Sequence, residues 1–351
     1  MKLLIITQKI DIQDPILGFF HRWVEEFSKR YEKVTVIALG VGEYKLPENV
    51  KVLSLGKEEF IRSHSYHSHI IRRLVAIYRF YKYIWQERKN YDSVFVHMNQ
   101  EYVILGWKLW WLLDKKIMLW RNHPMGNFFT NIAVWVSDRV FCTSEYAYTA
   151  KFKKTEIIPV GIDTNLFKRR PEVKKAPNSV LFLGRISPVK NIHLLIEALN
   201  LLNKENFSFN AAIIGDAPER DRQYYASIKN KINEYGLEKM IDLRGAVTPR
   251  EAPDLYNKYE LFVNLTVTGS MDKTIFEAMA CETLILTSNQ SLKGFIDNVF
   301  VINEDNVVQL ASSIKEIISL SDDKKIGLGG ELRNFSVEKH SLVKLMAMIF
   351  K

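Results

Sequence analysis

Two short stretches, about eighty residues apart, carry the residue types that bind phosphate: Val180–Asn191 and Thr268–Cys281. Each is typical of a strand that turns through small residues into the start of a helix. Unpaired backbone amides and the positive end of the helix dipole converge at such turns, which therefore favour anions. Two turns of this kind facing one crevice would hold a diphosphate.

The first turn holds Arg185 and Lys190. Arginine offers a planar fork for two phosphate oxygens, whereas lysine supplies a point charge. We expect Ser187-Pro188 to open the following helix in the favoured cap-then-proline order, with both cations beside the helix start. The alternative is two solvated charges on a loop, because a Gly-Arg turn alone is weak evidence.

The second turn leads to Glu277, which lies in Thr274–Cys281, a run otherwise suited to a buried helix. A carboxylate in such surroundings needs a partner. The neighbouring hydroxyls of a ribose would supply one, and an ion pair with an adjacent helix is the alternative. Upstream, Gly269 permits close backbone approach, and Asp272 is expected to cap the helix.

The composition is that of an ordinary globular protein, with 351 residues, 47% hydrophobic and 25% charged. The length favours two domains. Cys142 and Cys281 give neither a disulfide framework nor a zinc spacing, which fits a reducing cytoplasm. The apolar run Leu3–Ile6 is typical of a buried strand rather than a signal peptide, and no window has the apolar length of a membrane-spanning helix.

The charge is unevenly placed along the chain. Residues 1–170 carry 27 Lys/Arg against 17 Asp/Glu, whereas residues 171–351 carry 22 against 23. All seven tryptophans also lie in the first half. The first half is therefore expected to meet an anionic partner with apolar parts, and the second half a small molecule.

Apolar runs alternate with helical patterns throughout, which predicts parallel sheets covered by helices on both faces. We expect an α/β fold with two Rossmann-like, doubly wound domains that face a central crevice. The domains span 1–165 and 166–337, with a basic linker over 168–177, and a last helix over about 336–350 crosses back onto the first domain through about 338–351. The predicted strands are Leu3–Ile6, Val34–Leu39, Val50–Leu55, Ser93–Val96, Ile117–Trp120, Arg139–Thr143, Ser179–Leu183, Ala211–Ile214, Ile241–Leu243, Leu261–Leu265 and Leu284–Thr287.

Taken together, these segments resemble the retaining nucleotide-sugar glycosyltransferases of family four, which have the two-domain GT-B architecture. The order and spacing of the matching stretches run through most of the second half, and jointly they are specific. They are Ile158–Phe167, Gly184–Asn191, Ile214–Glu219, Leu243–Val247 with Leu255–Tyr256, and Phe276–Cys281.

The resemblance implies a role for each candidate in the second half. Arg185 and Lys190, with Gly184, would hold the donor diphosphate, Glu277 the ribose, and the backbone near Val247 the base. The donor sugar would be lined by Gly269, Ser270, Met271, Asp272 and Lys273. The family usually has a second glutamate eight positions before the helix glutamate, and Gly269 stands there. The sugar therefore stays open, with Ser270, Asp272 or Lys273 as substitutes.

The first half matches the family less strongly. Asp14–Phe20 resembles its first glycine-containing loop, which places Gly18 near the donor phosphates. His97 and His123 close successive strands, whose ends face the crevice in open parallel sheets. The resemblance implies that His123 lies beside the donor sugar as a catalytic residue, and we expect His97 and Asn99 on the acceptor side. A structural histidine is the alternative at each position.

The implied reaction is hexosyl transfer with retention of configuration, from a UDP-linked donor, in the synthesis of envelope polysaccharide or glycolipid. Arg185 and Lys190 would stabilise the charge on the leaving diphosphate, whose departing oxygen would take the acceptor proton. The chain has no Asp-x-Asp pair, so we expect no bridging metal ion and no cofactor.

Residues 62–89 and 106–116 mix basic and aromatic side chains, as interfacial helices do. We expect a glycan or lipid-linked acceptor, a cytoplasmic protein, and peripheral contact of 62–89 with the anionic inner face of a membrane. Ordinary packing is the alternative: at least one of Trp110 and Trp111 must be core. His64, His67 and His69 are more typical of a solvated loop than of a metal site.

Other functions fit parts of the sequence. The same fold could serve a nucleotide-sugar epimerase or hydrolase, or a non-catalytic nucleotide-sugar-binding protein, since Gly269 replaces a glutamate. Basic, aromatic surfaces also bind single-stranded nucleic acid. The near-neutral second half and its phosphate turns argue against nucleic acid as a partner.

Overall fold

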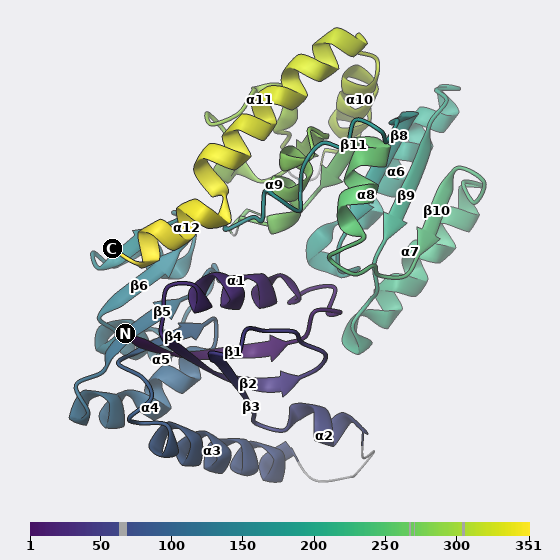
Figure 1. Cartoon of the computed structure of the whole chain (residues 1–351). Helices are drawn as coiled ribbons and strands as arrows, with labels where there is room; N and C mark the ends of the chain where they lie inside the picture. Colours follow the sequence, from purple (N-terminus) through teal and green to yellow (C-terminus); the bar gives the residue numbers. More distant parts are fainter. Residues whose placement is uncertain (63–68, 267, 270, 304–305) are drawn as a thin grey trace. The chain divides into compact units, whose positions relative to one another are not determined.

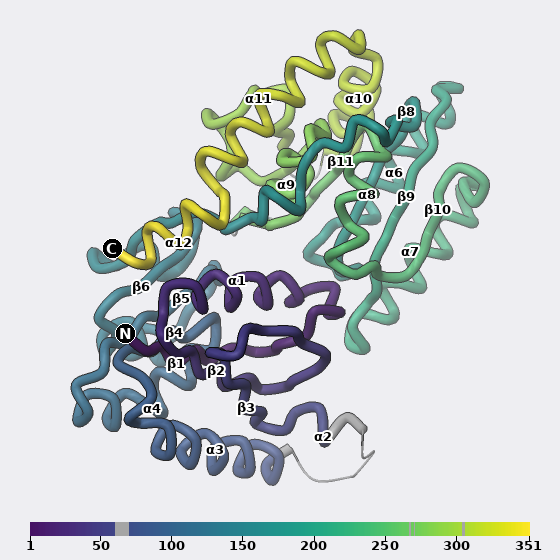
Figure 2. The backbone as a smooth tube through the Cα atoms, viewed as in Figure 1, coloured from purple at the N-terminus to yellow at the C-terminus, as the bar shows by residue number. Residues whose placement is uncertain are grey.

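The computed structural model describes residues 1–62, 69–266, 268–269, 271–303 and 306–351. The chain divides into two compact units, Met1–Ile158 and Pro159–Lys351 (Figure 1). The backbone trace in Figure 2 follows the chain through the first unit and then the second, from purple to yellow. Each unit is built around one parallel sheet, so the two predicted Rossmann-like domains are confirmed.

The sheet of the first unit has the strand order β3-β2-β1-β4-β5-β6-β7, and every neighbouring pair is parallel. The order reverses direction between β1 and β4, the switch point at which open α/β sheets bind ligands. The six strands predicted in this half are all present, because buried parallel strands are continuous apolar runs. Their bounds are β1 Lys2–Ile10, β2 Lys33–Val41, β3 Val50–Ser54, β4 Ser93–His97, β5 Lys116–Trp120 and β6 Arg139–Cys142, with β7 Thr155–Ile157 in addition.

Three helices share one hydrophobic core on one face of this sheet: α3 (His69–Gln86), α4 (Gln100–Leu112) and α5 (Phe128–Val136). We call them the three-helix layer. Within it, Trp110 is fully buried and its neighbour Trp111 is 76% exposed, so one of the two is core, as expected. A β-carbon at Gly106, one turn earlier, would lie 2.4 Å from the Trp110 ring. Glycine at 106 therefore makes room for the tryptophan.

The remaining helices of the first unit are α1 (Phe19–Ser28) and α2 (Lys57–Arg62). Helix α1 follows the predicted pattern and buries Phe20, Trp23, Val24 and Phe27. Among the described residues, none of the helices in either unit combines the length and apolar character that a bilayer crossing requires.

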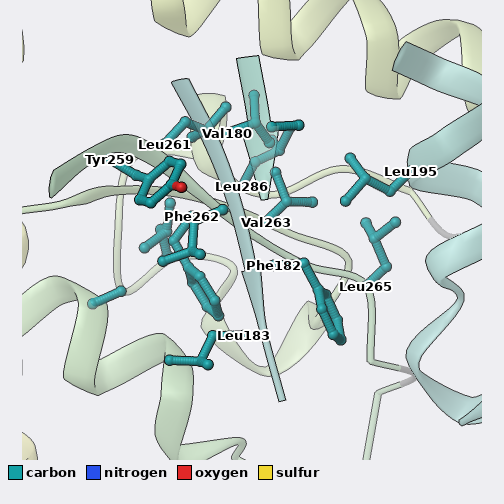
Figure 3. Packing of buried hydrophobic residues seen from close by; sticks show 14 of the residues in the cluster. Val180, Phe182, Leu183, Leu195, Tyr259, Leu261, Phe262, Val263, Leu265 and Leu286 are labelled. Carbon is teal, nitrogen blue, oxygen red and sulfur yellow. The ribbon is translucent and has the colours of Figure 1, made fainter. Parts of the chain in front are cut away.

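The second unit repeats the same winding in a sheet ordered β10-β9-β8-β11-β12, again with all neighbours parallel. Its switch point lies between β8 and β11, and Figure 3 shows side chains of both strands packed in the core. All five predicted strands are present. The elements are β8 Ala176–Leu183, β9 Asn210–Ile214, β10 Ile241–Arg244, β11 Tyr259–Asn264, β12 Leu284–Thr287, α6 Ile192–Lys204, α7 Arg222–Glu234, α8 Ala252–Lys258, α9 Lys273–Ala280, α10 Val307–Ile318, α11 Asp322–His340 and α12 Leu342–Ile349.

Two helix predictions in this unit are wrong. Ser187-Pro188 heads only a short 3-10 turn, Pro188–Lys190, because Asn191 has a left-handed backbone (φ 48°) and α6 begins after it. The last helix is also broken: Ser341 is extended between α11 and α12, and caps α12 by accepting from the Lys344 amide at 3.4 Å. The expected packing of the final helix on the first domain stays a prediction.

The break at Ser341 coincides with a long-range pairing. The His340 carbonyl accepts from the amides of Gly161 and Ile162 at 3.0 and 2.9 Å, and the Leu342 amide donates to the Ile162 carbonyl at 2.7 Å. The start and the end of the second unit are therefore hydrogen-bonded together in a parallel bridge.

Candidate functional site

Apart from Val247, the candidate residues of the second unit follow the ends of β8 and β11, on the two sides of the switch point. The turn after β8 contains Gly184, whose amide donates to the Ile214 carbonyl at 3.0 Å. The turn after β9 contains Gly215 (φ 157°), and a β-carbon there would lie 1.8 Å from the Gly184 oxygen. Only glycine at 215 allows the two turns to touch.

Arg185 follows directly, and its Nε is buried without a hydrogen-bond partner among the described residues. The hydroxyl of Ser187, two residues on, is also buried, and no described residue is its hydrogen-bond partner. Buried donors are nearly always satisfied in folded proteins, so these two groups have the capacity to donate to a further acceptor. Arg185 is half-buried, which leaves part of its side chain accessible.

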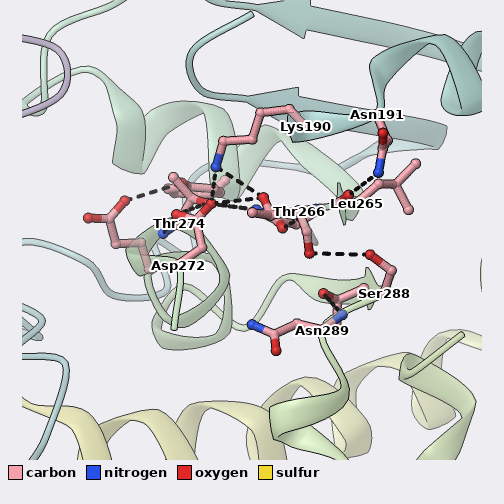
Figure 4. A network of polar contacts seen from close by, with 12 residues as sticks. Lys190, Asn191, Leu265, Thr266, Asp272, Thr274, Ser288 and Asn289 are labelled. Carbon is pink, nitrogen blue, oxygen red and sulfur yellow. Dashed lines mark hydrogen bonds and ion pairs between the residues drawn. The ribbon is translucent and has the colours of Figure 1, made fainter. Parts of the chain in front are cut away.

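Lys190, the second predicted cation, already has partners (Figure 4). Its ammonium donates to the Thr266 hydroxyl at 3.0 Å and forms an ion pair with Asp272. The Lys190 and Asp272 side chains are 15% and 14% exposed. The ion pair and the bond from Asn191 Nδ2 to the Leu265 carbonyl (3.2 Å) join the turn after β8 to the one after β11.

Asp272 is the centre of this polar network. It also accepts from Asn264 Nδ2 (3.0 Å), from the Thr266 hydroxyl (3.2 Å), and from the amide (3.3 Å) and hydroxyl (3.0 Å) of Thr274. Its bond to the Thr274 amide confirms the predicted cap of α9. Burial alone would raise the pKa of Asp272, but Lys190 and the hydrogen bonds hold it well below its usual value.

Glu277 lies one helical turn after Lys273 on α9. Its carboxylate accepts from the hydroxyl of the fully buried Tyr256 at 3.2 Å. Burial raises the pKa of Glu277, against the attraction of Lys273. Burial likewise lowers the pKa of Lys273, against the attraction of Glu277. The Glu277 carboxylate therefore accepts from Tyr256 among the described residues, and its lone pairs can accept from further donors.

The predicted sugar-lining residues are differently placed. Lys273 donates to the carbonyls of Val160 and Gly161 at 3.1 and 2.9 Å, so its ammonium is engaged with backbone. Gly269 has φ 143° in the turn, and Met271 packs against the core of the unit. Ser270 lies outside the described residues. Val247, in the loop after β10, is half-buried against the same core.

The candidates of the first unit lie at the carboxyl ends of its strands. His97, at the end of β4, is buried with its ring stacked on Phe20 at 4.2 Å, and its Nδ1 lies 3.3 Å from the Thr7 hydroxyl. His123 is exposed in the loop after β5, with Nδ1 3.0 Å from both the amide nitrogen and the carbonyl oxygen of Met125. The surroundings of His97 are those of a packing residue, whereas His123 presents its ring to solvent.

Two further candidates of this unit lie at helix starts. Gly18 is buried at the start of α1, and its amide donates to the Asp14 carbonyl at 2.9 Å. Asn99 precedes α4, with a buried Nδ2 that has no partner among the described residues. The roles of Gly18, His97, Asn99 and His123 toward a ligand stay predictions.

Sequence reasoning gave no role to several residues of this site. Asn264, Thr266 and Thr274 complete the network around Asp272, and Tyr256 contacts Glu277. Asn264 carried a usable signal, because it is a polar residue that ends a buried apolar strand at the carboxyl edge of the sheet. The structure shows no group of histidine, cysteine and carboxylate side chains arranged for a metal among its described residues. His64 and His67, and the side chain of His69, are not among them.

Comparison with known proteins gives a match that covers most of the second unit. Residues 163–327 match the family model for glycosyl transferases, group 1. The alpha-monoglucosyldiacylglycerol synthase of Streptococcus pneumoniae is 25% identical over 224 residues, which cover 57% of this chain and 49% of that protein. Spore coat protein SA of Bacillus subtilis is 24% identical over 213 residues, 55% of this chain and 56% of that protein. The chain thus aligns with about half the length of these relatives.

The fold comparison extends over the whole chain. HepE of Anabaena, whose crystal structure was solved in complex with UDP and glucose, matches with a TM-score of 0.78. The match covers 100% of this chain and 98% of that chain at 18% sequence identity, so it shows the fold alone. The expected resemblance to a two-domain, GT-B type of glycosyltransferase is confirmed.

Proposed function

We propose that this protein is a retaining glycosyltransferase that moves a sugar from a nucleoside diphosphate, UDP by preference, to a glycan or lipid-linked acceptor. The acceptor would belong to an envelope polysaccharide or glycolipid. The match to the group 1 glycosyl transferases supports the class of reaction, and the UDP complexes of HepE support the choice of donor.

The observation that carries the proposal is that Arg185 Nε is buried and finds no hydrogen-bond partner in the described part of the chain. It lies in the turn that follows β8, the first strand of a doubly wound sheet, and the Ser187 hydroxyl in the same turn also has no partner among the described residues. A diphosphate offers several acceptor oxygens and the charge that a guanidinium prefers. Lys190 would add a second cation by sharing its ammonium between Asp272 and a phosphate oxygen.

The proposed reaction needs no side-chain base. The bond between the anomeric carbon and the phosphate oxygen breaks while the acceptor oxygen bonds to the same face of that carbon. The acceptor proton passes to the departing phosphate oxygen. Arg185 and Lys190 stabilise the charge that grows on the diphosphate, an electrostatic effect that is usually the largest in such sites. In this mechanism the two cations do the work that a metal ion does elsewhere, so we propose metal-independent transfer.

A peripheral position on the cytoplasmic face of a membrane belongs to the same proposal. Helix α3 contains Arg72, Arg73, Arg79 and Lys82 and no acidic residue. One of these cations is already used, because Arg79 makes a two-pronged ion pair with Glu59 at 3.0 and 2.9 Å. Arg73 and Lys82 are exposed and are the better candidates for contact with anionic lipid.

A non-catalytic nucleotide-sugar-binding protein is the second candidate, favoured by Gly269 at the place of a carboxylate. Both candidates predict donor binding, but only the first predicts consumption of labelled donor when a lipid or glycan fraction is added. Labelled product that appears only with acceptor supports transfer, and free sugar without acceptor would indicate a hydrolase.

A thermal-shift panel of UDP, GDP and ADP sugars tests donor binding, since a bound ligand raises the melting temperature by mass action. Arg185→Ala should bind the donor about 10- to 100-fold more weakly, the effect of losing charge-assisted hydrogen bonds. Its transfer rate should fall about 10²- to 10³-fold. Arg220→Ala is the matched control, because that side chain is 74% exposed and lies in the same unit. Unchanged binding and turnover in Arg185→Ala would overturn the proposal.

A further inference from the structure

The outward surface of the three-helix layer carries large apolar side chains where a water-facing layer would carry polar ones. Eleven are exposed: Ile70, Ile71, Leu74, Tyr78, Tyr81 and Trp85 on α3, Trp111 and Leu112 on α4, and Phe128, Phe129 and Trp135 on α5. The three helices share one core on their inner side, so these residues belong to a single outer face. An apolar face of this extent marks a site of interaction.

Helix α5 is the most unusual part of this face. Its nine residues, Phe128–Val136, include no charged side chain. Thr130, Ala133 and Val134 are buried against the core, while Phe128 and Trp135, seven positions apart and so on one side, are 71% and 75% exposed. A helix on a water-exposed surface presents polar residues on its outer side. The exposed aromatic side chains of α5 instead favour contact with an apolar partner.

The charges of the three-helix layer indicate the chemical nature of that partner. The three helices contain five Arg/Lys, on α3 and α4, against the single acid Glu101. Arg73 and Lys82 are exposed on α3, and the Arg88 guanidinium lies 4.3 Å from the centre of the Trp85 ring at the end of the same helix. Cations that outnumber acids beside exposed Trp and Tyr are typical of helices that lie at the surface of anionic lipid.

We propose that the outer face of the three-helix layer lies on an anionic bilayer, with α5 and the end of α4 inserted at the level of the headgroups and upper acyl chains. In this arrangement α3 supplies attraction through charge, and α5 supplies affinity through apolar burial. The loop that carries His123 leads directly into α5 and would be held at the headgroups. This last point rests on the proposed function, since it matters only for a lipid-linked acceptor.

A second copy of the chain is a less favourable partner for the same face. A symmetric dimer brings the same patch of both copies together. Arg73 and Lys82 of each copy would then meet like charges across the interface, which opposes association. An anionic bilayer offers complementary charge to α3 and an apolar interior to α5, so one partner explains both halves of the face.

Flotation of the full-length protein with vesicles tests the proposal, with phosphatidylcholine vesicles compared with vesicles that also contain phosphatidylglycerol. The apolar variant is Phe128→Ser with Trp135→Ser, and the cationic variant is Arg73→Glu with Lys82→Glu. The control is Val308→Ser with Ile326→Ser, which removes exposed apolar side chains from the second unit. Circular dichroism melts of each variant show whether the fold is intact, and light scattering measures self-association.

Salt separates the two contributions, because it screens charge but not apolar burial. The cationic variant should lose roughly tenfold of its partitioning to anionic vesicles at low salt and match the parent at high salt. The apolar variant should lose roughly tenfold or more at high salt and bind detectably only at low salt. Parent protein that does not float, or an apolar variant that floats like the control at high salt, would overturn the proposal. So would a dimer that the apolar variant abolishes.

The donor-binding assay keeps this result separate from the proposed function. The apolar variant should give the parent's thermal shift with UDP-sugar, since its substitutions lie in the first unit, outside the turns of Arg185 and Lys190. Loss of vesicle binding with intact donor binding supports the inference on its own terms. Vesicle binding by a protein that binds no nucleotide would support the surface and refute the glycosyltransferase.

Discussion

Replacing Asp272 by asparagine should make the stability of the protein depend on nucleotide. The substitution keeps an oxygen that can accept from the Thr274 amide but leaves the Lys190 ammonium with Thr266 as its described partner. Breaking a fully buried ion pair costs about 3–5 kcal/mol. Because Lys190 and Asp272 keep 15% and 14% exposure, we expect a loss of about 2–3 kcal/mol in the free energy of unfolding.

A bound nucleoside diphosphate should return part of that loss. Its phosphate oxygens would replace the carboxylate as the partner of Lys190, so UDP should stabilise Asp272→Asn by about 1–2 kcal/mol more than it stabilises the parent. Urea unfolding with and without saturating UDP measures both quantities. Lys190→Met is the control background, in which Asp272→Asn should cost less because the pair is already broken. An equal loss with and without bound UDP would refute the role of Lys190 toward the diphosphate.

Three further outcomes follow from buried groups and glycines. Burial lowers the pKa of His340 to about 4, so the folded state opposes protonation of this imidazole. The free energy of unfolding should be highest above about pH 6.5 and fall by about 2 kcal/mol as the pH approaches 4. In urea titrations His340→Gln should reduce this dependence on pH. Burial raises the pKa of Glu277. Its contribution to the free energy of unfolding is therefore fully present below about pH 4.3 and is lost as the pH rises through the folded pKa. Without nucleotide, Glu277→Gln should be more stable than the parent at pH 8 but not at pH 4, and it should bind nucleotide more weakly. Gly106→Ala should lower the free energy of unfolding by about 1–2 kcal/mol, because the new β-carbon would contact Trp110. Gly330→Ala in α11, where a β-carbon meets nothing within 4 Å, should raise it by up to about 1 kcal/mol. The denaturant midpoints of the two variants should move in opposite directions.

The sheets could be predicted from sequence because their strands are short, continuous apolar runs. The strand that was missed, β7, has three residues, Thr155–Ile157, and no apolar run at all. Ser187 and Pro188 do begin a helical turn, as the local sequence pattern predicts. The left-handed backbone of Asn191 ends that turn at Lys190, so the α-helix starts later than predicted. The break at Ser341 depends on hydrogen bonds to Ile162, and no local pattern contains a contact of that range.

The candidate site shows the same division. The capping role of Asp272 is local and was predicted, whereas its pairing with Lys190 joins residues 82 positions apart and was not. The family resemblance implies that Lys273 lines the donor sugar, but in the structure its ammonium donates to the carbonyls of Val160 and Gly161. Residue types thus indicate which turns are candidates for ligand binding. The structure shows which charged side chains in those turns already make ion pairs or hydrogen bonds within the protein.

The pairing of residues 160–162 with 340–342 has a practical consequence for anyone who expresses the second unit alone. A fragment that starts at 166 or stops at 337, as the sequence pattern suggests, would remove one side of the bridge and expose the donors and acceptors of the other. A start at 166 would also remove the Val160 and Gly161 carbonyls that accept from the Lys273 ammonium. A fragment meant to retain nucleotide affinity should therefore begin before Pro159 and continue beyond Leu342.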